Sequence, residues 1–154
     1  SSVDFSAPEL FLRSIFLESD IWSIGCLTVY MLQSPEDRIK LPLIAATASD
    51  DNIEALVLSK MMLLSCVSES DLQAFCLECI KDKKQRKWLQ DLYYRTVVPH
   101  LATNSPHKLL SQHFSRPVPS DVIDFVAACL QFLPSKRPPL EHLSQMPFLL
   151  RTIQ

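Results

Sequence analysis

The chain of 154 residues contains a single glycine, Gly25, although glycine makes up roughly 7% of average proteins. Loops that hold phosphate through backbone N–H groups need several glycines, so such a loop is excluded from these residues. The chain also lacks an apolar run of the ~18 residues that a membrane span needs, and it does not begin with a secretory signal pattern. We therefore expect an intracellular protein, cytoplasmic or nuclear, without membrane contact.

The net charge and the cysteine content further restrict the class of protein. The formal net charge of −2 provides no general attraction to nucleic acid. The cysteines are odd in number and scattered among apolar residues, which favours reduced core side chains over disulfides. Cys76 and Cys79 have half of the spacing of a zinc site, but no second pair follows, so a core role is favoured over a metal site.

The apolar spacing and the prolines predict a mainly α-helical chain without strands or repeats. The predicted helices span residues 8–14, 20–33, 49–64, 68–80, 84–96, 107–112, 121–132 and 138–145. Residues 34–48 contain Pro35 and Pro42 and are predicted to be irregular.

The segment 20–33 is the clearest of these helices. Ser19 or Asp20 is predicted to cap it, and a carboxylate suits the positive end of a helix. Its apolar side chains cover nearly the whole circumference, which predicts a helix that is buried on all sides.

Three segments stand in order along the chain. They are Ser6-Ala7-Pro8-Glu9-Leu10, then Ser19-Asp20-Ile21-Trp22-Ser23-Ile24-Gly25-Cys26, and finally Phe132-Leu133-Pro134-Ser135-Lys136-Arg137-Pro138-Pro139 with Met146-Pro147-Phe148 behind it. Together they resemble landmarks in the C-terminal lobe of eukaryotic protein kinases, and they cover nearly the whole chain. The resemblance implies that residues 1–154 form part of a kinase-like C-lobe, without the N-terminal lobe.

Within that family the chain is most similar to the branch of cyclin-dependent and MAP kinases. Residues 7–13 look like that branch's Ala-Pro-Glu-Leu-Leu-Leu-Gly, and the long stretch 36–118 resembles its insert. Two departures mark a divergent member. Ser6 stands where the branch has an arginine that helps to bind a substrate proline, and Leu133 replaces the usual aspartate.

The resemblance assigns roles to matched residues. Glu9 and Arg137 would form a buried ion pair, because a planar guanidinium can hold a carboxylate through two parallel bonds. Without the resemblance they would be two unrelated surface charges. Ser2 would be the hydroxyl of the substrate loop that positions catalytic groups, or else a plain loop serine.

Three further residues belong to the segment 19–26. Asp20 would accept backbone amides from the catalytic loop, while its simpler interpretation is a helix cap. Trp22 and Gly25 would be core residues beside it. Trp22 is more readily a core side chain than a platform for a ligand.

By resemblance, the parent reaction is phosphoryl transfer from MgATP to serine or threonine hydroxyls. It needs a lysine on the phosphates, a metal-binding aspartate and a catalytic-loop aspartate. None can be assigned within residues 1–154, so we name no catalytic residue and expect no cofactor here; ATP and magnesium would belong to the complete parent. The chain would supply the substrate-loop exit and a helical platform, with the remainder of the kinase domain, or a covering chain, and a protein substrate or scaffold as partners.

Two alternatives remain. One is a pseudokinase or scaffold that binds protein partners and transfers nothing, which the departures at Asp4, Ser6 and Leu133 favour. The other is a helical adaptor that uses the basic run 81–88 on an acidic partner or on nucleic acid. A solvated helix junction is the simpler interpretation of that run, and the acidic chain disfavours nucleic acid.

Overall fold

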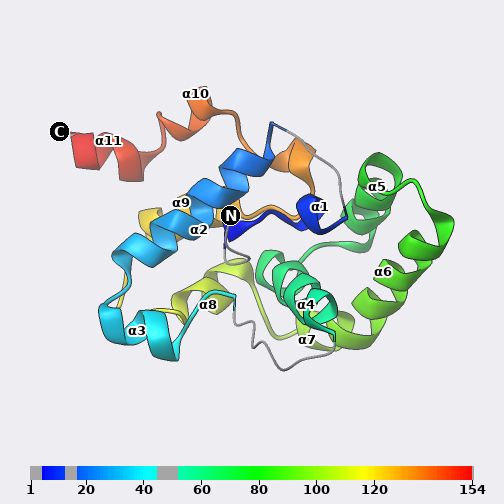
Figure 1. Ribbon diagram of the computed structural model, residues 1–154. Coiled ribbons are helices and arrows are strands. Elements are labelled where there is room, and N and C mark those ends of the chain that lie inside the picture. The colour runs from blue at the N-terminus through cyan, green and yellow to red at the C-terminus, as the bar shows by residue number, and fades with distance from the viewer. Residues whose placement is uncertain (1–4, 13–16, 45–51, 154) are drawn as a thin grey trace.

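The computed structural model describes residues 5–12, 17–44 and 52–153, and every regular element within these ranges is helical (Figure 1). The α-helices are α1 (Pro8–Phe11), α2 (Ser19–Leu32), α3 (Pro35–Lys40), α4 (Ile53–Ser65), α5 (Glu69–Cys79), α6 (Lys83–Thr96), α7 (Val98–Leu101), α8 (Pro106–Ser111), α9 (Ser120–Cys129), α10 (Leu140–Leu143) and α11 (Pro147–Ile153). A 3₁₀ turn, η2, spans Pro134–Lys136. The mainly α-helical class predicted from the sequence is confirmed.

Helix α2 packs lengthwise on α9, and α11 and α8 lie against other parts of α9. On the other side of the molecule α4 contacts α6, α8 and α1 (Figure 1). One continuous apolar core joins the two sides. None of the helices in the described ranges is both long and apolar enough to cross a membrane.

Local signals in the sequence explain why the α4–α6 side folds as it does. Ser68 caps α5 by accepting a hydrogen bond from the backbone N–H of Asp71 (3.2 Å). The hydroxyl of the buried Tyr93 in α6 donates to the carbonyl of Val67 (2.8 Å), which fixes the turn between α4 and α5. The rings of Phe75 and Phe132, 4.4 Å apart, then bring α5 against the segment before η2.

The prediction of an irregular segment at 34–48 is wrong for its first part, which forms α3. Ser34 caps this helix by accepting from the backbone N–H of Asp37 (3.1 Å), and Pro35 occupies the first turn. A proline there loses no hydrogen bond, because the first N–H groups of a helix have no partner within it. The same reason explains α7 and α11, which begin at Val98-Pro99 and at Pro147 and were also not predicted.

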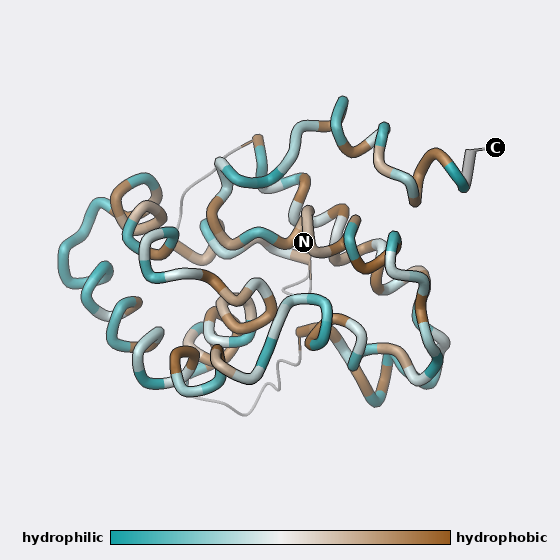
Figure 2. The backbone as a smooth tube through the Cα atoms, turned by 180° about the vertical axis from the view of Figure 1, so that it is seen from behind, coloured by the Kyte–Doolittle hydropathy of each residue, from teal (hydrophilic) through white to brown (hydrophobic). Residues whose placement is uncertain are grey.

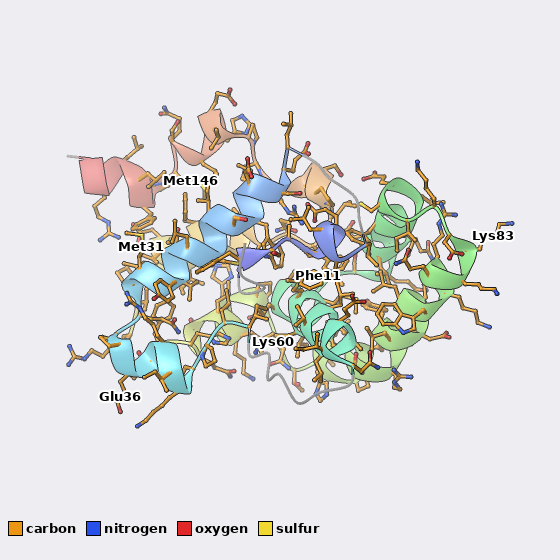
Figure 3. All side chains as sticks on the ribbon, in the orientation of Figure 1. Phe11, Met31, Glu36, Lys60, Lys83 and Met146 are labelled. Atoms are coloured by element: carbon orange, nitrogen blue, oxygen red, sulfur yellow. The ribbon has the colours of Figure 1, made fainter. Side chains whose placement is uncertain are left out.

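Helix α2 is not buried on all sides, which corrects the prediction from its composition. Its inner side, which carries Trp22, Gly25, Cys26 and Val29, is buried. The opposite side carries Asp20, Ile24, Leu27 and Met31 at helical spacing, and Leu27 and Met31 are 47% and 66% exposed. We call these four residues the open side of α2; Figure 3 labels Met31 on it.

Candidate functional site

Glu9 in α1 and Arg137, directly after η2, form a buried ion pair although 128 residues separate them. The two guanidinium nitrogens donate to the two carboxylate oxygens over 2.8 and 2.9 Å, and both side chains are 0% exposed. This two-bond geometry is the strongest form of a carboxylate–guanidinium contact. We call the pair the clasp.

Every N–H of the Arg137 guanidinium has an acceptor. Besides Glu9, it donates to the backbone carbonyls of Glu18 (3.1 Å), Gln131 (2.8 Å) and Phe132 (3.1 Å). Since a guanidinium has five N–H donors, none is left unsatisfied. Arg137 therefore ties α1, the start of α2 and the segment after α9 to one another.

The start of α2 contributes two more groups to the clasp. Ser19 lies in the first turn and donates its hydroxyl to the Glu9 carboxylate. This contact corrects the prediction that Ser19 or Asp20 caps the helix, because the capping position falls on Glu18 and no side chain caps it. The Arg137 guanidinium also lies over the ring of Trp22, 5.2 Å from its centroid.

Trp22 and Gly25 are core residues of the inner side of α2. Trp22 is completely buried, and its indole Nε1 finds no acceptor among the described residues. A Cβ atom on Gly25 would lie 2.7 Å from the Cβ of Cys129 and 2.9 Å from a methyl group of Leu130. The one glycine of the chain therefore stands at a close approach of α2 to the end of α9, and its lack of a side chain permits that approach.

Asp20 is exposed and lies at the edge of an open hollow of about 580 Å³. The hollow is lined by acidic and apolar residues of the start of α2 and of α10, namely Leu17, Glu18, Asp20, Ile21, Ile24, Pro139, Leu140 and Glu141. Within the described residues no ion pair neutralises its three carboxylates, and no cation lines it. We call this feature the acidic hollow; it adjoins the open side of α2, because Asp20 and Ile24 belong to both.

The structure thus brings together most of the residues predicted to matter. Glu9 and Arg137 meet in the clasp, Trp22 lies beside them, and Gly25 lies further along the same side of α2. Asp20 faces the acidic hollow instead of the clasp. Ser2 lies outside the described residues.

Sequence reasoning missed Ser19 as a clasp residue and Glu18 and Glu141 as part of the acidic hollow. Ser19 stands inside a quoted segment, and a hydroxyl next to a helix start is ordinarily interpreted as a cap. Glu141 reaches the hollow only because η2 and α10 fold back toward α2, which no local pattern reveals.

The chemistry available to the buried thiols is limited. Burial raises the pKa of Cys79 and of Cys129 to about 12, so both remain protonated and are poor nucleophiles at neutral pH. In the ranges that the structure covers, no three His, Cys, Asp or Glu side chains are grouped so that they could hold a metal ion. What the site offers is a rigid clasp beside an uncovered acidic and apolar surface, which is an arrangement for binding.

No model of a known protein family matches this chain. The chain is 30% identical, over 146 residues and 95% of its length, to a protein of Dictyostelium discoideum described as a probable inactive protein kinase. It spans about a tenth of the length of that relative. The similarity supports a relationship to kinase-like proteins.

Proposed function

We propose that residues 1–154 are the helical platform of a kinase-like domain that binds protein segments without transferring a phosphoryl group. The observation that carries this proposal is the uncovered surface formed by the open side of α2 and the acidic hollow. Leu17 at the edge of the hollow is 91% exposed, and Leu140 is 62% exposed. Contiguous exposed apolar surface of this kind marks an interaction site.

The rest of the site explains how such a platform stays rigid. The clasp fixes α1 and the segment after α9 against the start of α2, and the tight contact at Gly25 fixes α2 against α9. A preformed surface loses little conformational entropy when a partner binds. The buried contacts on the inner side of α2 thus keep the open side of α2 in a fixed position.

The charge of the surface defines what can cover it. Carboxylates that have no ion-pair partner among the described residues, next to leucine and isoleucine, suit a segment that presents N–H donors or cations beside apolar side chains. The kinase resemblance implies the same contact, since its aspartate at the position of Asp20 accepts backbone amides of the catalytic loop. The expected occupant is therefore the remainder of a kinase-like domain, with residues 36–118 as the insert of its C-lobe.

We place the inactive alternative first because the similar protein of Dictyostelium discoideum is described as a probable inactive kinase. The departures at Ser6 and Leu133 agree with it. The second candidate is a serine/threonine kinase of the cyclin-dependent and MAP kinase branch, whose ATP and magnesium would be held by parts other than residues 1–154. The resemblance of residues 7–13 and 36–118 to that branch favours this candidate.

A dye-binding experiment tests the platform. Residues 1–154 alone should bind a hydrophobic dye through the open side of α2, and the Leu27→Ser/Met31→Ser variant should bind clearly less. The matched control is Ile39→Ser/Leu56→Ser, which removes two exposed apolar side chains elsewhere and should leave most of the dye signal. Equal loss of signal in both variants would contradict the proposal.

A second measurement separates the inactive platform from the kinase. In the full chain that contains residues 1–154, we expect no transfer of labelled γ-phosphate from MgATP to serine, threonine or general protein substrates. Transfer that persists through purification and disappears in an Asp20→Ala variant would favour the kinase candidate instead.

A further inference from the structure

The turn between α5 and α6 carries a concentration of positive charge that the platform function does not use. Residues 81–87 contain five cations and one carboxylate, a net of +4 in a chain whose total is −2, so the remaining residues sum to −6. Figure 2 shows this turn coloured as hydrophilic, and Figure 3 shows the labelled Lys83 pointing away from the ribbon.

Four of these cations are exposed lysines without an ion-pair partner among the described residues. We call Lys81, Lys83, Lys84 and Lys87 the basic corner. Elsewhere on the surface, several exposed cations have acidic partners: Lys40 pairs with Glu36, Lys136 with Asp71, and Arg151 with Asp121. Exposed Arg95, Lys108 and Arg116 have no ion-pair partner among the described residues either, but each stands apart from other cations in the sequence. The basic corner is therefore an exception in how many unpaired cations it gathers in one short segment.

The position of the lysines makes the exception sharper. The first turn of α6 contains no acidic residue, and its cations stand at the positive end of the helix dipole. The Asp82 carboxylate caps the helix by accepting the backbone N–H of Lys84 (2.9 Å), and it offsets only one of these positive charges. Positive side chains at this end raise the free energy of the helix, and a bound anion would lower it.

Arg86 differs from its neighbours and is not part of the proposed surface. Its Nε donates to the backbone carbonyl of Ile80 (2.6 Å), so it holds the α5–α6 turn in shape. This separates a structural cation from four solvent-facing ones within one basic run. A variant that removes Arg86 would change both the shape of the turn and its charge, so a loss of binding could not be assigned to either.

We propose that the basic corner is a docking site for a short anionic protein segment rich in Asp and Glu. Leu77 lies on the last turns of α5, a few residues before Lys81 in the chain, and its 71% exposed side chain is available for an apolar contact. A protein segment fits better than nucleic acid for two reasons. Trp88 is partly buried against the core and so is not an open platform for stacking, and the net negative remainder of the chain repels a long polyanion.

Fluorescence anisotropy with the full chain tests this proposal. The probes are a labelled Glu-rich peptide of about 12 residues, a version of it with two phosphoserines, a neutral peptide of equal length, and single-stranded and duplex DNA of about 20 nucleotides. We expect the anionic peptides to bind and the neutral one not to bind, with affinity falling steeply between about 0.05 and 0.2 M salt. Binding of the phosphorylated peptide alone would show that carboxylates do not suffice, and it would overturn the proposal.

The deciding variant is Lys83→Gln/Lys84→Gln/Lys87→Gln, which should weaken peptide binding at least about tenfold. Its matched control, Lys40→Gln/Lys108→Gln/Arg116→Gln, removes the same charge from other exposed positions and should bind as the unchanged protein does. Absence of peptide binding, equal weakening in both variants, or tighter binding of DNA than of either peptide would each overturn the proposal. Circular dichroism of both variants checks that α6 is retained.

Discussion

Two arginines contact aromatic rings near opposite ends of α2, and their settings differ completely. Arg38 lies over the exposed Tyr30, 4.2 Å from the ring centroid, and donates from Nε to the Tyr30 carbonyl (2.8 Å). Arg137 lies over the buried Trp22 at a longer distance, 5.2 Å, with all of its donors used. The shorter contact is the one in solvent.

The comparison teaches that burial, more than proximity, decides how much an arginine–aromatic contact contributes to the stability of the fold. Water competes for the guanidinium of Arg38 and screens its charge. Arg137 is buried from solvent, which therefore cannot readily replace a lost acceptor, so each group there depends on every other. Buried contacts of α2 should therefore be sensitive to substitution, and exposed contacts tolerant.

The largest effect is expected for Arg137→Ala, which leaves Glu9 charged and buried without a partner. We expect the free energy of unfolding to fall by about 3–5 kcal/mol, measured by urea unfolding with tryptophan fluorescence. The Glu9→Gln/Arg137→Met double variant should lose less than Arg137→Ala, because it removes the stranded charge. A loss below about 1 kcal/mol for Arg137→Ala would show that the clasp does not hold the structure.

The next effect concerns the contact between α2 and α9. Gly25→Ala places a methyl group 2.7 Å from the Cβ of Cys129, which is fixed to the backbone of α9, so the helices must separate. Alanine favours a helix by about 1 kcal/mol over glycine, and overpacking costs about 1–3 kcal/mol, so we expect a net loss of up to about 2 kcal/mol. Thermal unfolding measures it. The control is Thr28→Ala, which adds no atoms to α2 and should change stability little. Equal losses of stability for Gly25→Ala and Thr28→Ala would contradict the idea that Gly25 is needed for the contact with α9.

A smaller effect should appear only in acid, at the C-terminal end of α2. There Gln33 donates to the carbonyls of Leu41 and His113 (both 2.8 Å), and His113 contacts the same Leu41 carbonyl through Nδ1 (3.1 Å). Burial lowers the pKa of His113 below its ordinary 6.5, and the nearby Lys60 lowers it further, against the hydrogen bond to Leu41, which raises it.

The sign of the pH dependence follows from this shift. As pH falls through about 6.5, the unfolded chain takes up a proton that the folded chain resists, so the free energy of unfolding decreases. Urea unfolding between about pH 7.5 and 5 should show this decrease in the unchanged protein and less of it in His113→Asn. The exposed His100→Asn serves as control. A pH dependence that is identical in the two variants would contradict the assignment.

The smallest effect is expected for Arg38→Gln, which removes the exposed counterpart of Arg137. An exposed cation–π contact contributes about 0.5–1 kcal/mol, so the midpoint of urea unfolding should shift only slightly. The stability of Arg38→Lys should lie between that of the unchanged protein and that of Arg38→Gln, since lysine retains the charge but lacks the planar group. A loss as large as that of Arg137→Ala would break the comparison between the buried and the exposed arginine.

Much of the fold could be predicted because it depends on local patterns. The apolar spacing located α2, α4, α5, α6, α8 and α9 to within a few residues. Helices α3, α7 and α11 were missed because proline excludes the interior of a helix but suits its first turn, and composition alone does not distinguish the two positions.

The candidate site was harder to predict. Glu9 and Arg137 were paired only through the kinase resemblance, because nothing local connects two charges so far apart in the chain. Ser19 and Glu141 were missed, since their contacts depend on where α1 and α10 come to lie. Side chains that meet through folding leave little trace in a single sequence.

By itself, the sequence determined a mainly helical protein with a single glycine and a strongly apolar helix at residues 20–33, because helix propensity, capping and apolar spacing act within a few residues. Only the tertiary structure decided that this helix is buried on the side of Trp22 and open on the side of Met31. It also decided that Arg137 has a buried partner while Lys83 has none among the described residues. The physical reason is that burial and charge pairing depend on distances between segments, which an apolar pattern covering the whole circumference does not specify.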